Sequence, residues 1–285
     1  MLVPHLNLRT AAAGAILALL LAAPDFARAQ GKFEASYGIS VARIPIGSAT
    51  ATAEFGDAHY LITMSGRASG MMRVLASGDG SLRTRGSFTD GRPAPTEFTA
   101  RTTTDDDTLD VKLVIDGGNV TALSASEPPP DPDRVELTDA HRRGIVDPLT
   151  ALLVPLEGAG APNAAACQRT LAVFDGRRRF DLKLAFKRMD TVKAERGYAG
   201  PAVVCAVTLQ PIAGHRSSST MVKFLTQGRD IEMTLAPVAG TRLLAPFRIT
   251  IVNMLGNLVV QANRFEVVHA VPTTGQTTHQ GAPSR

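Results

Sequence analysis

The residues that could carry out chemistry are few, and they lie far apart in the sequence. His215 and Arg216 follow Gly214 at an expected turn, where an imidazole acts as a general base only beside a partner that the sequence does not reveal. No Gly-x-Ser-x-Gly, Ser-x-x-Lys or His-Glu-x-x-His spacing occurs. The sequence therefore identifies no catalytic residue, no metal ligand and no cofactor.

The acidic residues have structural explanations beside the chemical ones. Asp147 precedes Pro148, which favours the start of a helix with the carboxylate as its N-cap over a catalytic acid. Asp175 precedes Gly176, which is typical of a tight hairpin turn, and it leaves Arg177 available to pair with an acidic neighbour. The run of Asp at 105–107 is expected at a solvated hairpin tip, with a cation site as the alternative.

The chain contains two cysteines, Cys167 and Cys205. Zinc requires four ligands in a Cys or Cys/His cluster, and the six histidines are scattered along the chain. Redox chemistry favours a Cys-x-x-Cys spacing, which is absent. In an exported protein a single pair of thiols normally forms a disulfide, so we expect a structural bridge between them.

The first residues of the chain indicate export. Arg9 is followed by an apolar run over residues 11–23, and Ala27-Arg28-Ala29 provides the small residues of a signal-peptidase site. The run is shorter than the roughly 20 apolar residues that a membrane-spanning helix needs. We therefore expect residues 1–29 to be a cleaved signal peptide, and the mature protein to carry no membrane anchor.

Charge and aromatic content argue against two classes of ligand. The formal net charge is +4, and the one dense basic run, Arg177-Arg178-Arg179, would point to alternate faces of a strand. A nucleic-acid-binding surface needs a basic stripe with interleaved aromatic residues, so no nucleic acid is expected. With no Trp and 3 Tyr, aromatic platforms for sugars are poorly supported as well.

Alternating apolar residues dominate the mature chain and predict β-strands. Phe33, Ala35 and Tyr37 begin this pattern, and it recurs up to Phe265. About a dozen such strands would expose a large apolar face in a flat sheet. We therefore predict an all-β fold, mainly antiparallel, with a strongly curved sheet in the form of a half-barrel or spiral.

One region breaks the period of two. Apolar residues near helical spacing predict one principal helix over residues 147–156, covering the concave face of the sheet. A shorter helical segment is expected at 69–76, and the prolines of 127–132 indicate a stiff connection. Residues 30–271 are expected to form one domain, and residues 272–285 a disordered tail.

Several motifs together resemble a family of exported proteobacterial proteins known as a domain of unknown function, the 3108 family. They are Asp147-Pro148-Leu149, Cys167, Val173-Phe174-Asp175-Gly176, Gly200-Pro201, Pro211-Ile212-Ala213-Gly214-His215 and Pro246-Phe247-Arg248. The resemblance covers nearly all of the chain from Phe33 to Val268. It implies a periplasmic location, and it carries no established catalytic residues. By looser analogy, related exported proteins have curved sheets similar to lipoprotein carriers.

The features above favour a non-enzymatic protein of the cell envelope that binds an apolar or lipid-like ligand, or a partner protein, on its curved sheet. Two alternatives stay open. One is a periplasmic hydrolase whose site is assembled only in the fold, for instance with His215 beside an aspartate. The other is a structural interaction module whose core is solidly packed.

Overall fold

A computed structural model describes residues 31–69, 78–104, 108–126, 131–158, 160–226, 230–252 and 256–269. Within these ranges, fifteen strands join in one sheet. The expected signal peptide, the aspartate run at 105–107 and the tail lie outside the described residues, as do most of the expected helical segment at 69–76 and the first part of the proline connection.

The alternation of apolar residues in the sequence corresponds to alternating burial along the strands. Phe33, Ala35 and Tyr37 of β1 (Gly31–Val41) are buried while their neighbours are half-exposed. The other early strands are β2 (Ile44–Phe55), β3 (His59–Ala68), β4 (Gly78–Thr89), β5 (Arg92–Thr104), β6 (Thr108–Asp116) and β7 (Asn119–Ala125). Each pairs with the next in antiparallel fashion, as consecutive hairpins do.

The second half of the chain continues the same sheet. Its strands are β8 (Val154–Pro155), β9 (Arg169–Phe174), β10 (Arg179–Lys193), β11 (Arg196–Gly197), β12 (Ala199–Ala213), β13 (Ile231–Pro237), β14 (Leu243–Ile251) and β15 (Leu258–His269). The order across the sheet is β7-β6-β5-β4-β3-β2-β1-β15-β14-β13-β12-β10-β9, so the last long strand pairs with the first. Among the strands that the structure describes, only β11 lies parallel to its partner, β15.

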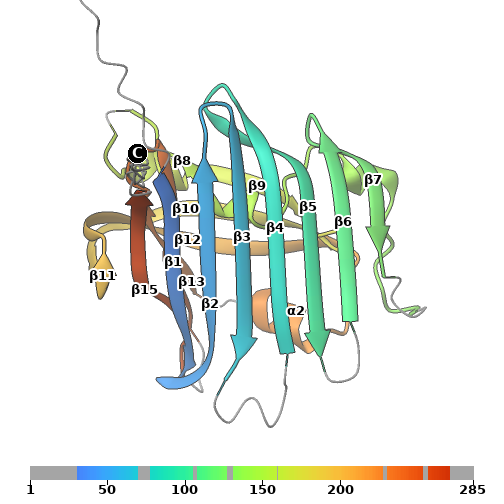
Figure 1. Ribbon diagram of the computed structural model, residues 1–285. Coiled ribbons are helices and arrows are strands. Elements are labelled where there is room, and N and C mark those ends of the chain that lie inside the picture. Colours follow the sequence, from blue (N-terminus) through green and yellow to red (C-terminus); the bar gives the residue numbers. More distant parts are fainter. Residues whose placement is uncertain are drawn as a thin grey trace, which may run out of the picture.

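The sheet is strongly curved but not closed by strand pairing. The long strands β10 and β12 cross behind the strands of the first half of the sheet (Figure 1). Register shifts at several pairings, including β1 with β15 and β13 with β14, increase the local twist that this bending requires. The prediction of an all-β, mainly antiparallel, curved sheet is confirmed.

Residues 145–146 link the two edges of the sheet. The Ile145 amide donates to the Gly118 carbonyl in the β6–β7 turn, with N and O 2.8 Å apart, and Val146 forms a parallel bridge with Val173 of β9. The β9–β10 turn also packs inward, where a Cβ on Gly176 would overlap the Val111 side chain of β6. Gly176 has φ +95°, so glycine is favoured there for conformation as well as space.

The helix expected over residues 147–156 is much shorter than predicted. Its only helical turn is a 3₁₀ turn, η2 (Thr150–Leu152), and the chain is extended again at Leu153. The reason is that the next residues find hydrogen-bond partners on β14: Val154 pairs with Leu244, and the Leu156 amide donates to the Arg242 carbonyl. The α-helix that the structure describes, α2 (Thr220–Thr226), lies elsewhere, between β12 and β13.

Two hydrophobic clusters hold the fold together. The larger joins the concave face of β1–β6 to residues 145–153, which enter it as a plug, and to the aromatic rings of Phe247 and Phe265. The smaller surrounds Cys167 and Cys205 and includes side chains of β8, β12, β13 and β14. Residues 145–153 therefore fill one end of the concavity, whereas the chain that follows them packs against the second half of the sheet.

Candidate functional site

A pocket of about 460 Å³ lies at the end of the concave face that the plug does not reach. Apolar side chains of four strands line it: Ile39 of β1, Ile46 and Ala49 of β2, Met64 of β3 and Leu82 of β4. These residues continue the inward-facing alternation of the buried core residues Tyr37, Ala51, Ile62 and Thr84. We call this pocket the groove.

The floor of the groove is made of residues without long side chains. Gly66 pairs with Ala49 on one side and with Gly80 on the other, and Gly47 pairs with Ala68 in the next row. A Cβ built on Gly66 or Gly80 would come no closer than 3.6 Å to its neighbours. Packing therefore does not require glycine at these two positions. Because glycine has no side chain, the space above the backbone is open.

An apolar row extends from the groove along the rim of the sheet. Directly paired residues share a face, and the pairs Ile44 with Val41, Val41 with Leu258, and Leu258 with Ile251 place one row across β2, β1, β15 and β14. Val41, Leu258 and Ile251 are half-exposed, and Ile44 is 59% exposed. The open end of the concavity thus presents apolar surface to solvent.

The opposite, plugged end contains a buried carboxylate, Asp147. Its Oδ1 accepts hydrogen bonds from the amides of Leu149 (2.9 Å) and Thr150 (3.1 Å), so it caps the η2 turn. Its Oδ2 accepts from the hydroxyls of Thr150 (2.5 Å) and Thr84 (3.0 Å). Burial raises the pKa of the carboxyl group because charge is costly away from water, although these four hydrogen bonds oppose the shift.

A tyrosine extends this network to a second strand. The Tyr60 hydroxyl lies 2.8 Å from Thr150 Oγ1, and burial raises the pKa of the phenol well above its ordinary value. Because Thr150 donates to Asp147, Tyr60 acts as the donor to Thr150. The network ties the plug to β3 and β4, and no residue in it lines the groove.

The other predicted site residues gather beside two neighbouring turns. Asp175 Oδ1 accepts from the amides of Arg177 (2.8 Å) and Arg178 (2.6 Å), which is the hairpin-turn role that the sequence indicated. Gly214 lies directly against the carbonyl of Arg177 and has φ +80°. The turns that follow β9 and β12 are thus in contact.

His215 and Arg216 leave the second of these turns toward residues 131–135. Arg216 forms an ion pair with Asp131, and the Val135 amide donates to the His215 carbonyl. His215 Nδ1 is buried without a hydrogen-bond partner in the part of the chain that the structure describes. The structure therefore brings Asp175, Arg177, His215 and Arg216 to one region but shows no hydrogen bond between this histidine and a carboxylate.

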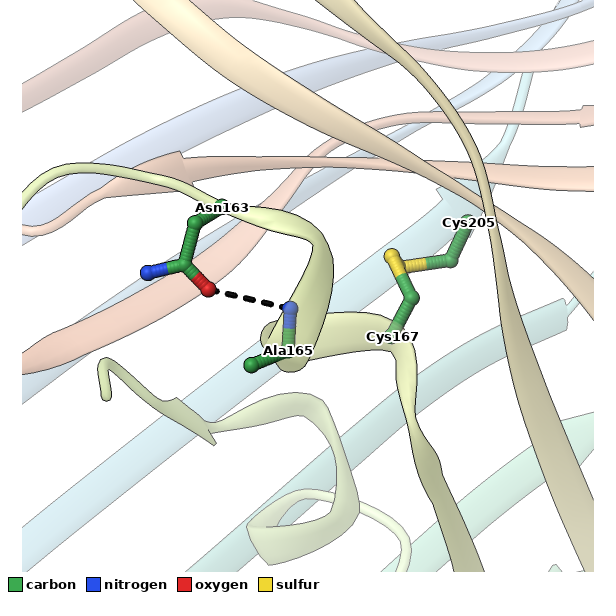
Figure 2. The surroundings of a disulfide bond; sticks show 4 residues. All are labelled: Asn163, Ala165, Cys167 and Cys205. Carbon is green, nitrogen blue, oxygen red and sulfur yellow. Dashed lines mark hydrogen bonds between the residues drawn. A yellow bond between two sulfur atoms is a disulfide. The ribbon is translucent and has the colours of Figure 1, made fainter. Parts of the chain in front are cut away.

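Cys167 and Cys205 form a disulfide with an S–S distance of 2.03 Å, and both are fully buried. Cys167 ends the 3₁₀ turn η3 (Ala164–Cys167), whose first residues are capped by Asn163 Oδ1 accepting from the Ala165 amide at 3.0 Å (Figure 2). Cys205 lies in the middle of β12. The bridge fastens the segment after the plug to the second half of the sheet.

Within the described ranges, metal-binding clusters and membrane-spanning helices are both absent. No group of three or more His, Cys, Asp or Glu side chains is placed there to hold a metal ion. No helix in the same ranges is long and apolar enough to cross a membrane.

Sequence reasoning missed both the groove and the partners of Asp147. The groove floor carries a visible signal, since Gly78 and Gly80 lie two residues apart in one strand and Gly66 lies in its neighbour, so all three face the same side. The Asp147 network carries none, because Thr84 is 63 residues away in the sequence.

Comparison with known proteins identifies a family without an assigned activity. A model described as "Protein of unknown function (DUF3108)" matches residues 32–262. No curated protein matches the chain. Among solved structures, the crystal structure of a β-barrel-like protein of the domain of unknown function DUF1849 from Brucella abortus is 12% identical over 84% of this chain and 98% of that chain, with a TM-score of 0.45. The family match covers most of the sequence, and the chain belongs to the DUF3108 family.

Proposed function

We propose that this protein is a non-enzymatic, exported protein of the cell envelope that binds an apolar or lipid-like ligand in the groove. The observation that carries the proposal is the contrast within one concave face. Large side chains and the plug fill one end, whereas small residues and uncovered apolar side chains form the other.

The shape and chemistry of the groove suit an acyl chain. Its volume of about 460 Å³ lies within the range of roughly 300–1,000 Å³ that is common for small-molecule sites. Each methylene that leaves water contributes about 0.8 kcal/mol, so a chain lying on the glycine floor would be held without polar contacts.

The groove lining itself favours binding over hydrolysis. Thr102 is the lining residue whose polar side chain shares a face with the groove floor, and none of Asp147, Asp175 or His215 is among the lining residues. A hydrolase acting on a ligand in this groove would need a nucleophile and a base within reach of it. Among the residues that the structure describes, the lining supplies neither a histidine nor a carboxylate side chain.

Native mass spectrometry tests the ligand directly. Protein purified gently from its own cells should carry an added mass that lipid extraction identifies, and Leu82→Asp should lose it because a carboxylate at the groove wall opposes an apolar chain. Ser81→Asp is the matched control, since Ser81 is exposed on the other face of the same strand. Retention of the ligand by Leu82→Asp in a folded protein, or an empty wild-type protein that takes up no lipid from vesicles, would overturn the proposal.

The intact mass of the same preparation tests export. A mature chain that begins at Gln30 is the expected result, since cleavage after Ala29 removes the signal peptide. A chain that retains residues 1–29 would contradict the proposed location without affecting the groove.

A further inference from the structure

One strand of the sheet has an edge that is only partly paired. β10 pairs with β12 along its whole length, from Arg179 to Lys193, but β9 pairs only with the part from Arg179 to Leu184. No described residue pairs with the other edge of residues 185–193. Most residues of this stretch are exposed, although Val192 is buried.

The ladder with β12 shows which backbone groups point outward along this edge. Thr191 pairs with Pro201, which has no N–H, so this is not a pair that exchanges two hydrogen bonds. In agreement, the Thr191 amide donates to the carboxylate of its neighbour Asp190 at 2.8 Å. Because the two kinds of pair alternate, the N–H and C=O groups of Met189, Thr191 and Lys193 face away from β12.

The two faces of this edge differ in chemistry. Phe186 and Met189 pair with the buried Cys205 and Val203, so they share one face, and they are 43% and 45% exposed. Lys187 and Arg188 reach Glu232 on the other face, at 2.8 and 2.9 Å. This edge carries charges, as edges that avoid other strands usually do, but it also leaves an apolar pair uncovered.

The geometry points to a docking site for an extended peptide segment of a partner protein, which adds as a strand along residues 188–193 of β10. Its apolar side chains would contact Met189 and Phe186, and its acidic side chains would face the cations. Lys187, Arg188 and Lys193 outnumber Glu232 and Asp190 along this edge, so an acidic strand is favoured over a basic one. The bulge between Phe186 and Arg188 sets the start of the regular edge.

Peptide titration with backbone controls tests this inference on the full-length mature protein. The probe is a capped eight-residue peptide of alternating Val and Glu, and its control has the same sequence with alternate amides N-methylated. We expect saturable binding of the first peptide only, with slowed hydrogen exchange in residues 185–193. Equal binding of both peptides, or slowed exchange elsewhere in the chain, would overturn the proposal, because neither requires the backbone of this edge.

Two substitutions at one position separate backbone from side-chain effects. Thr191→Pro removes an outward N–H, which a docked strand would take over from the Asp190 carboxylate, without touching the β12 ladder. It should weaken peptide binding by at least about tenfold, whereas Thr191→Val should leave it within about twofold. Circular dichroism and thermal midpoints establish that both variants are folded. Equal binding by both folded variants would refute the docking edge, and so would a wild-type protein whose edge is already occupied by a second copy in sedimentation experiments.

Discussion

The two ends of the concave face are built on the same strands, yet they differ in what covers them. At the plugged end, Tyr60, Phe98 and Leu113 are almost fully buried beneath residues 145–153. At the open end, β2, β3 and β4 present Ala49, Gly66 and Gly80, and residues 145–153 do not reach them. Part of a curved sheet therefore becomes core or groove according to the size of its side chains and to where a single connecting segment enters the concavity.

The plugged end is expected to dominate stability, because the plug and the segment after it are held by both covalent and buried polar bonds. Changing both Cys167 and Cys205 to Ala opens a loop with a sequence separation of 38 residues. In the chain-entropy model this lowers the free energy of unfolding by about 4 kcal/mol. Urea unfolding followed by circular dichroism measures it, and a fall of less than about 1 kcal/mol would show that the bridge contributes little here.

Asp147 provides the next largest expected effect. Asp147→Ala leaves the amides of Leu149 and Thr150 and the Thr150 hydroxyl without their acceptor, whereas the Thr84 hydroxyl keeps the Glu97 carbonyl, and the change should cost about 3 kcal/mol. Asp147→Asn keeps one amide oxygen as an acceptor for the turn and should cost less than half as much. Thermal and urea midpoints of the two variants give the comparison, and equal losses would show that the polar network is not what holds the plug.

The pH dependence of stability tests the contribution of Asp147 to the plugged end. The pKa of Asp147 is raised in the folded state by burial, so its contribution is fully present below the ordinary pKa of the carboxyl group. That contribution is lost as the pH rises through the raised pKa. The stability of the wild type minus that of Asp147→Asn should therefore decrease with increasing pH, and other carboxylates cancel in this difference. An increase with pH would mean that the four hydrogen bonds outweigh burial.

At the open end, a larger side chain should raise the stability of the protein, whereas the substitutions at the plugged end should lower it. Gly80→Ile has room for its Cβ, whose closest neighbour would be the Arg101 carbonyl at 4.0 Å, and a β-branched residue suits a strand better than glycine. We expect the free energy of unfolding to rise by roughly 0.5–1 kcal/mol. Urea unfolding checks this, with Ser81→Ile on the other face as the control; a large loss for Gly80→Ile would show that the space above the floor is needed for folding.

The strands of this fold could be predicted from sequence because the residues of each strand carry the alternating pattern themselves. The alternation in Phe33, Ala35 and Tyr37, and the Asp90-Gly91 and Gly117-Gly118 turns with positive φ, indicate hairpins one at a time. The pairing of β1 with β15 joins residues more than two hundred positions apart, and no local pattern encodes it. The prediction of a principal helix was wrong because it also depended on distant residues. The hydrogen-bond partners that end η2 after Leu152 lie on β14.

The candidate site was less predictable than the fold. Asp147 was identified as a cap from Pro148 and its neighbours, but Thr84 and Tyr60 belong to strands that only the fold brings near it. The groove depends on small residues facing the concave side, and on the plug stopping short of them. That second condition is set by the three-dimensional course of residues 145–153 and leaves no trace in composition.

The central claim is that the open end of the concave face binds an apolar ligand, and a titration with a fluorescent fatty acid tests it most directly. The wild type and Ser81→Ile should bind the probe with the same affinity, whereas Gly80→Ile, which fills the groove from its floor, should bind at least about tenfold more weakly while being at least as stable as the wild type. Unchanged binding by Gly80→Ile would place the ligand elsewhere and contradict the account.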